Sequence, residues 1–191
     1  MNHTIQKTWL EKIVYQWDII EVVQQNMQIW EKQKVFEFAR RSPWTRLIII
    51  NKNKEVLITK ERRFEINKFD YRLPWWKVFD ELSKYNEYLK NNWDILEVAK
   101  QWAISEAKQE CWIKINKLDL LKISKCWATI QRDLYYFVSN DFELLKSQDL
   151  ELWENISLNR IWLDETKELC ISDNFSEERS AMILLKYLTK L

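Results

Sequence analysis

Residues 97–113 are the most informative part of this chain, and they read EVAKQWAISEAKQECWI. Small and apolar side chains recur in and just before this stretch at spacings of three and four. They are Ile95, Val98, Ala99, Trp102 and Ala103. This period is typical of an amphipathic helix with one buried face, so the sequence predicts a helix over residues 95–111.

Two carboxylates on this predicted helix form the first candidate for chemistry. Glu106 and Glu110 are four residues apart, which places them on one helix face about 6 Å from each other. Such a pair repels by roughly 0.2 to 0.5 kcal/mol, and a bound cation reverses the sign. Mg²⁺ prefers carboxylate oxygens with retained waters. The alternative is that both glutamates belong to a solvated helix face.

The glycine and tryptophan counts are unusual. At the usual share of ~7% glycine, 191 residues should hold about 13. The chain has 0 Gly and 12 Trp. Several Trp stand where turns favour glycine, as in SPWT (residues 42–45), LPWWK (73–77) and NNWD (91–94). Our interpretation is that UGA codons, read as glycine in the source, were translated as tryptophan; the alternative is a chain that carries 12 Trp.

With Trp read as Gly, the helical stretch resembles a known motif. Glu97, seven further residues and then SEAKQECWI (residues 105–113) match the Nudix box, whose second half reads Arg-Glu-aliphatic-any-Glu-Glu-any-Gly-aliphatic. Residues 71–77, YRLPWWK, read as a strand that ends in Leu-Pro-Gly-Gly-Lys. The chain departs from the motif at Ser105, at Gln109 and in the longer segment between Trp76 and Glu97.

The resemblance extends from about residue 14 to the C-terminal helix and is closest to the ADP-ribose pyrophosphatase branch. Three further segments carry it: FEFARRSPW (residues 36–44), TKERR (59–63) and LWENI (152–156). They imply substrate-binding roles for Glu37, Arg41, Arg62 and Arg63. They also imply a late loop that presents a water-activating carboxylate, with Glu154 as first choice and Glu151 as second.

The resemblance implies a fold and an assembly. The fold is α+β, an α/β/α sandwich over residues 42–191, preceded by a small antiparallel β segment over residues 1–41 that mediates a homodimer. A hairpin-like unit cannot bury enough apolar surface alone, which favours the same assembly.

The resemblance also implies metal-dependent hydrolysis of ADP-ribose or a related nucleoside-diphosphate sugar, which gives a nucleoside monophosphate and a sugar phosphate. Glu106 and Glu110 would hold Mg²⁺ or Mn²⁺, with Glu97 and the carbonyl of Trp75 completing the metal site. The substrate partner is a nucleoside-diphosphate-linked small molecule. Pyrophosphate cleavage needs a cation to neutralise phosphoryl charge and a carboxylate to orient water, so histidine is not required.

Composition excludes several other classes. The 30 basic and 29 acidic residues balance, so no global field attracts nucleic acid or anionic membranes. We find no apolar stretch near the ~18 residues of a membrane span and no signal-peptide pattern, which predicts a cytoplasmic protein. The only histidine is His3, and Cys111, Cys126 and Cys170 fit neither a disulfide framework nor a zinc site.

The remaining pattern indicates mixed secondary structure. Strands are expected over residues 18–23, 34–38, 46–50, 55–59, 116–124, 133–138 and 156–161, and helices over 79–90 and 177–190. Residues 51–54 read as a hairpin turn. Two other functions stay open: a nucleotide-binding module that lost catalysis, favoured by Ser105 and Gln109, and a single-stranded nucleic-acid binder that uses literal Trp as stacking platforms.

Overall fold

The structure is a computed structural model, which describes residues 5–63, 67–126, 129–145 and 156–191. Its elements in chain order are β1 (Ile5–Gln16), β2 (Glu21–Ile29), β3 (Lys32–Arg40), β4 (Trp44–Ile49), β5 (Glu55–Arg63), β6 (Lys68–Arg72), β7 (Trp75–Lys77), α1 (Leu82–Asn91), α2 (Ile95–Glu110), β8 (Ile113–Ser124), β9 (Ile130–Gln131), β10 (Leu134–Leu144), β11 (Ile156–Trp162), α3 (Leu163–Cys170) and α4 (Glu178–Leu188).

The chain divides into two compact units. The first comprises Met1–Trp44, Lys77–Ile95 and Ser124–Leu134, and the second comprises Thr45–Trp76, Leu96–Ile123 and Tyr135–Leu191. The first therefore holds β1 to β3, α1 and β9, and the second holds nearly all other elements. The division into domains at residue 41 stays a prediction.

The first unit is a sheet with the strand order β1-β2-β3-β9. β1, β2 and β3 pair antiparallel, whereas the short β9 runs parallel to β3. Helix α1 is tied to this sheet because Asn86 donates a hydrogen bond of 2.9 Å to Glu21. Glu21 is fully buried and also pairs with Arg40 at 3.1 Å, which compensates for the burial of its charge.

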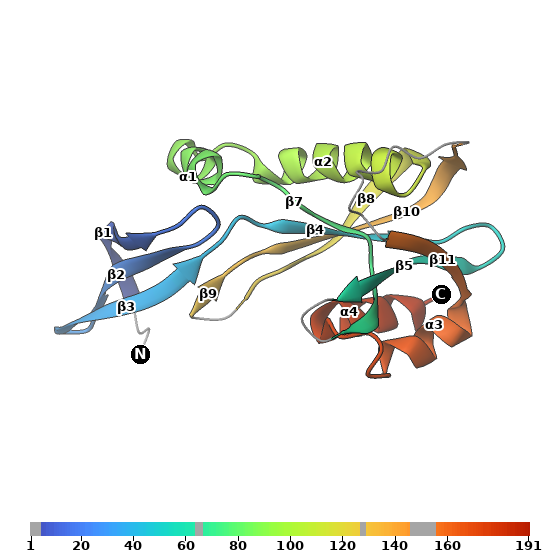
Figure 1. Cartoon of the computed structure of the whole chain (residues 1–191). Coiled ribbons are helices and arrows are strands. Elements are labelled where there is room, and N and C mark those ends of the chain that lie inside the picture. Colours follow the sequence, from blue (N-terminus) through green and yellow to red (C-terminus); the bar gives the residue numbers. More distant parts are fainter. Residues whose placement is uncertain (1–4, 64–66, 127–128, 146–155) are drawn as a thin grey trace. The chain divides into compact units, whose positions relative to one another are not determined.

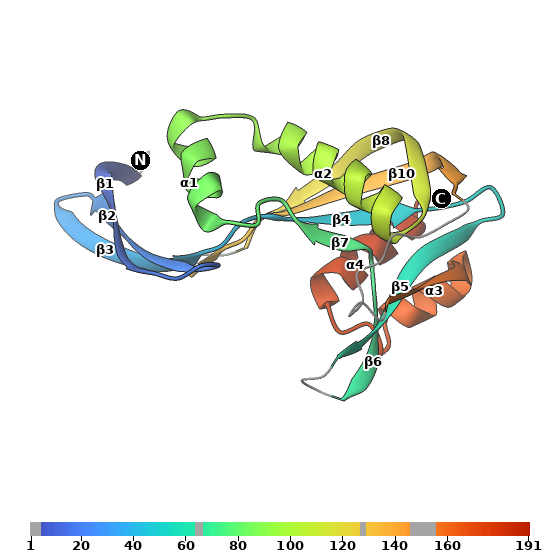
Figure 2. The ribbon, with the colours of Figure 1, turned by 45° about the horizontal axis from the view of Figure 1, so that its top comes forward.

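The second unit has strands between helices. One sheet has the order β7-β4-β10-β8 and the other has the order β11-β5-β6. Figures 1 and 2 show α2 on one side of these strands and α3 and α4 on the other. The expected α+β fold with helices on both sides of the strands is therefore confirmed.

Short apolar runs form the core of this unit. In β4 and β5 successive residues are buried on both faces, as central strands between two helical layers require. These residues are Leu47, Ile48, Ile49, Val56, Leu57 and Ile58. Helix α4 adds Ala181, Leu184 and Leu188 at helical spacing.

Among the helices that the structure describes, none has the length and apolar character to cross a membrane.

The predicted helices and the hairpin turn agree with the structure. The helix expected over residues 95–111 is α2. The one expected over 79–90 is α1, which begins and ends later, and the one expected over 177–190 is α4, which is shorter at both ends. The turn over residues 51–54 is present, because the Asn51 side chain accepts a hydrogen bond of 2.9 Å from the backbone of Asn53.

The N-terminal segment differs from the expectation. The prediction of a strand over residues 18–23 is wrong at its start, because the backbone N–H of Trp17 bonds to the carbonyl of Ile20 at 2.8 Å and closes a turn there. Strand β2 begins only at Glu21. Two further strands were not expected from the sequence: β1, which pairs with the neighbouring β2, and β9, which pairs with the distant β3.

Several tryptophans occupy backbone or core positions that suit the residue poorly. Trp30 and Trp112 have φ values of 56° and 55°, the left-handed region that disfavours bulky side chains. Trp30 is also the first residue of the two-residue turn between β2 and β3. The indole N–H groups of Trp76 and Trp112 are buried without a hydrogen-bond partner among the described residues.

Candidate active site

Helix α2 is positioned by a row of small residues. Ala99, Ala103 and Ala107 recur every four positions and are buried, so this face of the helix contacts the strands. Glu106 and Glu110 lie next to this row in the helical sequence and are half-buried. The local sequence thus directs both carboxylates to the margin of the buried face.

Glu106 and Glu110 both affect the pKa of a buried thiol, that of Cys111. Burial raises the pKa of Cys111, and the negative charges of Glu110 and then of Glu106 raise it further. Both charges also lie toward the C-terminal end of α2, where the helix dipole is negative. A cation bound between them would relieve this unfavourable concentration of negative charge.

The donor chemistry fits a hard divalent cation. Glu106 and Glu110 offer oxygen ligands, which Mg²⁺ and Mn²⁺ prefer over nitrogen or sulfur. In the described part of the chain, no group of three or more His, Cys, Asp or Glu side chains is arranged to hold a metal ion. The two glutamates are thus the carboxylate donors that α2 itself can bring together.

Glu97 lies on a different side of the same helix. It precedes Glu106 by nine positions, about two and a half helical turns, which places the two side chains on opposite sides. Glu97 is exposed and accepts a hydrogen bond of 2.7 Å from Gln101. The structure therefore does not bring Glu97 together with Glu106 and Glu110, and its role as a metal ligand stays a prediction.

A cavity of about 350 Å³ lies along this side of α2. Its described lining consists of Glu97, Val98, Gln101, Trp102 and Ser105. The lining is mixed, with a carboxylate, an amide and a hydroxyl beside an indole. It includes Ser105, which replaces the arginine of the Nudix box. The cavity thus runs beside the first part of the motif.

The Leu-Pro-Trp-Trp segment is fixed to β4. The carbonyl of Pro74 accepts a hydrogen bond of 3.0 Å from Leu47, and the carbonyl of Trp76 accepts one of 3.3 Å from Thr45. The guanidinium of Arg46 lies 5.8 Å from the ring centre of Trp75. These contacts hold β7 at the edge of its sheet; the metal-binding role of the Trp75 carbonyl stays a prediction.

The predicted substrate-binding arginines of β5 point to opposite faces. Arg62 and Arg63 are consecutive in a strand, so their side chains alternate. Arg62 donates a hydrogen bond of 2.8 Å to Asn67, and Arg63 lies 3.5 Å from Glu61. The two guanidinium groups therefore do not form one anion site.

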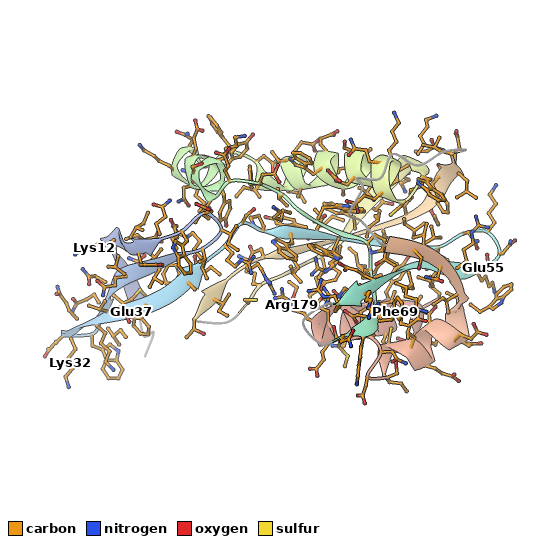
Figure 3. All side chains as sticks on the ribbon, in the orientation of Figure 1. Lys12, Lys32, Glu37, Glu55, Phe69 and Arg179 are labelled. Carbon is orange, nitrogen blue, oxygen red and sulfur yellow. The ribbon has the colours of Figure 1, made fainter. Side chains whose placement is uncertain are left out.

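The other predicted site residues lie elsewhere. Glu37 and Arg41 belong to the first unit, where Glu37 is exposed on β3 and accepts a hydrogen bond of 2.7 Å from Gln24 (Figure 3). Glu151 and Glu154 fall outside the described residues.

The second unit contains a buried polar cluster that was not expected from the sequence. Arg46 is almost fully buried and lies 3.2 Å from Glu177, while the hydroxyl of Tyr136 lies 2.9 Å from that of Ser180. Burial first, and then the charge of Glu177, raise the pKa of Tyr136 to about 12. The one available signal was a charged residue, Arg46, inside an otherwise apolar strand.

Comparison with known proteins supports the fold. No protein-family model matches the chain, and no curated protein matches it. A solved structure described as an ADP compounds hydrolase is similar to it, with a TM-score of 0.67 and 15% sequence identity. The similarity covers 97% of this chain and 92% of that one. At this identity the likeness shows the fold alone, an α+β arrangement with helices on both sides of the strands.

Proposed function

We propose that this chain is a metal-dependent Nudix-type hydrolase that cleaves the diphosphate bond of ADP-ribose or a related nucleoside-diphosphate sugar. The observation that carries the proposal is the carboxylate pair Glu106 and Glu110 on α2, in the register of the Nudix box. The similarity to an ADP compounds hydrolase over nearly the whole chain supports it.

The proposed chemistry divides between the metal and the chain. Bound Mg²⁺ or Mn²⁺ would neutralise charge on the diphosphate and make phosphorus more electrophilic. Glu106 and Glu110 would hold the ion, and Glu154 or Glu151 would accept a proton from the attacking water. The water oxygen forms a bond to one phosphorus and the bridging P–O bond breaks. The products are a nucleoside monophosphate and a sugar phosphate.

We also propose a homodimer formed through the N-terminal strands. A group of large apolar side chains on β1, β3 and the turn after β1 is exposed, as at surfaces that bind a partner. They are Ile13, Val14, Tyr15, Trp17, Ile19, Val35 and Phe36. Strand β1 is also the edge of its sheet, which leaves one row of backbone groups to pair.

A weakened nucleotide-binding module is the second candidate. Ser105 and Gln109 remove an arginine and a carboxylate from the motif, and Ser105 lines the cavity along α2. A protein of this kind would bind the nucleotide and turn it over slowly or not at all. Turnover with Mg²⁺ therefore separates the two candidates.

The test is a substrate panel assayed with Mg²⁺ or Mn²⁺, with the chain as written and with Gly at all twelve Trp positions. Glu106→Gln and Glu110→Gln should each lower kcat by on the order of 10² or more, because each removes a charge-stabilising ligand. Glu165→Gln, an exposed glutamate on α3, is the matched control. Near-normal turnover in both box variants would refute the assignment.

A further inference from the structure

Two arginines from distant parts of the sequence become neighbours in the first unit. β3 and β9 run parallel, with Ala39 opposite Ile130 and Arg40 opposite Gln131. The pairing continues past both strands, because the backbone N–H of Arg41 bonds to the carbonyl of Gln131 at 2.9 Å. The next residue after Gln131 is Arg132, which therefore lies beside Arg41.

Both guanidinium groups flank one aromatic ring. The central carbon of Arg41 lies 5.5 Å from the ring centre of Trp44, and that of Arg132 lies 5.2 Å from it. Burial and then the charge of Arg132 lower the pKa of Arg41, so the two cations are close enough to repel. Like charges at neighbouring strand positions are destabilising.

No acidic side chain neutralises this pair in the described residues. Neither guanidinium donates a hydrogen bond or forms an ion pair there, and the Nε–H of Arg132 is buried without a partner. The preceding residue gives a contrast within the same strand: Arg40 pairs with both Glu21 and Glu11. Within the described residues, Arg40 therefore pairs with two carboxylates, whereas Arg41 and Arg132 pair with none.

One anion would satisfy both arginines at once. It would remove the repulsion between the cations and accept the orphaned N–H donors. Arginine is suited to this because its planar fork matches phosphate oxygens in a bidentate geometry. Asp133 follows Arg132 directly, and its negative charge contributes to raising the pKa of Tyr85.

We propose that Arg41 and Arg132 together form a binding site for a phosphoryl group. The inference rests on the proposed function only in part: Arg41 was expected to contact substrate, whereas Arg132 and the pairing are new. The phosphoryl group is either one phosphate of the substrate or free inorganic phosphate, and the chemistry of recognition is the same.

The direct test is calorimetric titration of the full chain with inorganic phosphate, in EDTA and at constant ionic strength. EDTA keeps the ion from entering through a metal on Glu106 and Glu110, so the result is independent of catalysis. Arg132→Gln and Arg41→Gln should each weaken phosphate binding by on the order of tenfold or more. Arg132→Lys, which keeps the charge but loses the fork, should bind with intermediate affinity.

Arg160→Gln is the matched control, because Arg160 is exposed on β11 and the substitution changes net charge equally. Equal weakening by Arg160→Gln and Arg132→Gln would mean general screening and would overturn the site. Unchanged binding in Arg132→Gln, with an unchanged Tm, would also overturn it.

Phosphate binding by the Trp44→Gly variant tests whether the two arginines form the anion site themselves or are held in place only by the indole of Trp44. If the indole alone organises the two arginines, its removal abolishes phosphate binding and refutes the proposal. If the arginines form an anion site, binding persists or tightens because the space beside them opens. Competition between phosphate and ADP-ribose would assign the site to a substrate phosphate, and binding without competition would assign it to free phosphate.

Discussion

Comparing Gly with Ala at the tryptophan positions tests whether Trp stands for Gly without reference to the gene. Trp30 and Trp112 have φ values of 56° and 55°. Gly and Ala both remove the indole and nearly all of its contacts, so their difference isolates the backbone requirement. At a left-handed position a Cβ costs about 1–2 kcal/mol, so Trp30→Gly should be more stable than Trp30→Ala by that amount.

Trp102 is the matched control position. It lies in the interior of helix α2 and is more than a third exposed. There Gly should be less stable than Ala by roughly 0.5–1 kcal/mol, because Gly loses more chain entropy on folding. The sign of the Gly-minus-Ala difference should therefore reverse between Trp30 and Trp102, and Trp112 should behave like Trp30.

The assay is urea denaturation of the six variants under one buffer condition. For a chain of this size about 1 kcal/mol corresponds to a Tm shift of about 2–4 °C, so thermal unfolding can confirm the ranking. At Trp30 the two-residue turn between β2 and β3 adds a second reason for Gly, because a type II′ turn prefers it at the first central residue. Ala equal to or more stable than Gly at both Trp30 and Trp112 would refute the reasoning.

Three further predictions concern catalysis, assembly and pH. Glu154→Ala or Glu151→Ala should alter the pH profile of kcat, because one of them activates water; unchanged profiles in both would place the base elsewhere. Val35→Lys combined with Phe36→Glu should convert a dimer to a monomer in light scattering at micromolar concentration, and a monomeric wild type would contradict the assembly. Burial raises the pKa of Cys170 from 9.0 to about 11, so the folded state keeps a proton that the unfolded chain releases. Stability should fall as pH rises from about 9 to 11, and Cys170→Ala should remove part of this loss in urea midpoints measured across that range.

Helix α2 could be predicted from the sequence because its information is local. The four-residue spacing of Ala99, Ala103 and Ala107 selects the buried face, and the same spacing places Glu106 and Glu110. Strands β4 and β5 were also expected, since each contains a short apolar run and a turn lies between them, although β5 continues past the predicted end to Arg63. Periodicity was sufficient wherever one element determines its own buried face.

The parts that escaped prediction depend on pairing between distant segments. Arg132 carries no local signal, and its significance comes from the parallel register of β3 and β9. The same holds for Arg46, whose partner Glu177 is 131 residues away in sequence. The placement of Glu97 was not predicted for a different reason. Its position in the motif suggested a metal site shared with Glu106, whereas helical geometry separates the two side chains.

The tryptophan hypothesis and the phosphate proposal meet at one residue. Trp44 is flanked by Arg41 and Arg132. The indole N–H groups of Trp76 and Trp112, beside and within the Nudix-like segments, are buried with no partner in the part of the chain that the structure describes. Glycine at each position would remove an unsatisfied donor or an obstruction and let backbone approach a phosphate closely. The variant with Gly at all twelve positions should therefore bind inorganic phosphate at least as tightly as the chain with Trp, and should be the more active hydrolase. Loss of phosphate binding in that variant, with folding intact, would overturn the arginine site, as it would in Trp44→Gly, and would oppose the reading of Trp as Gly at this position.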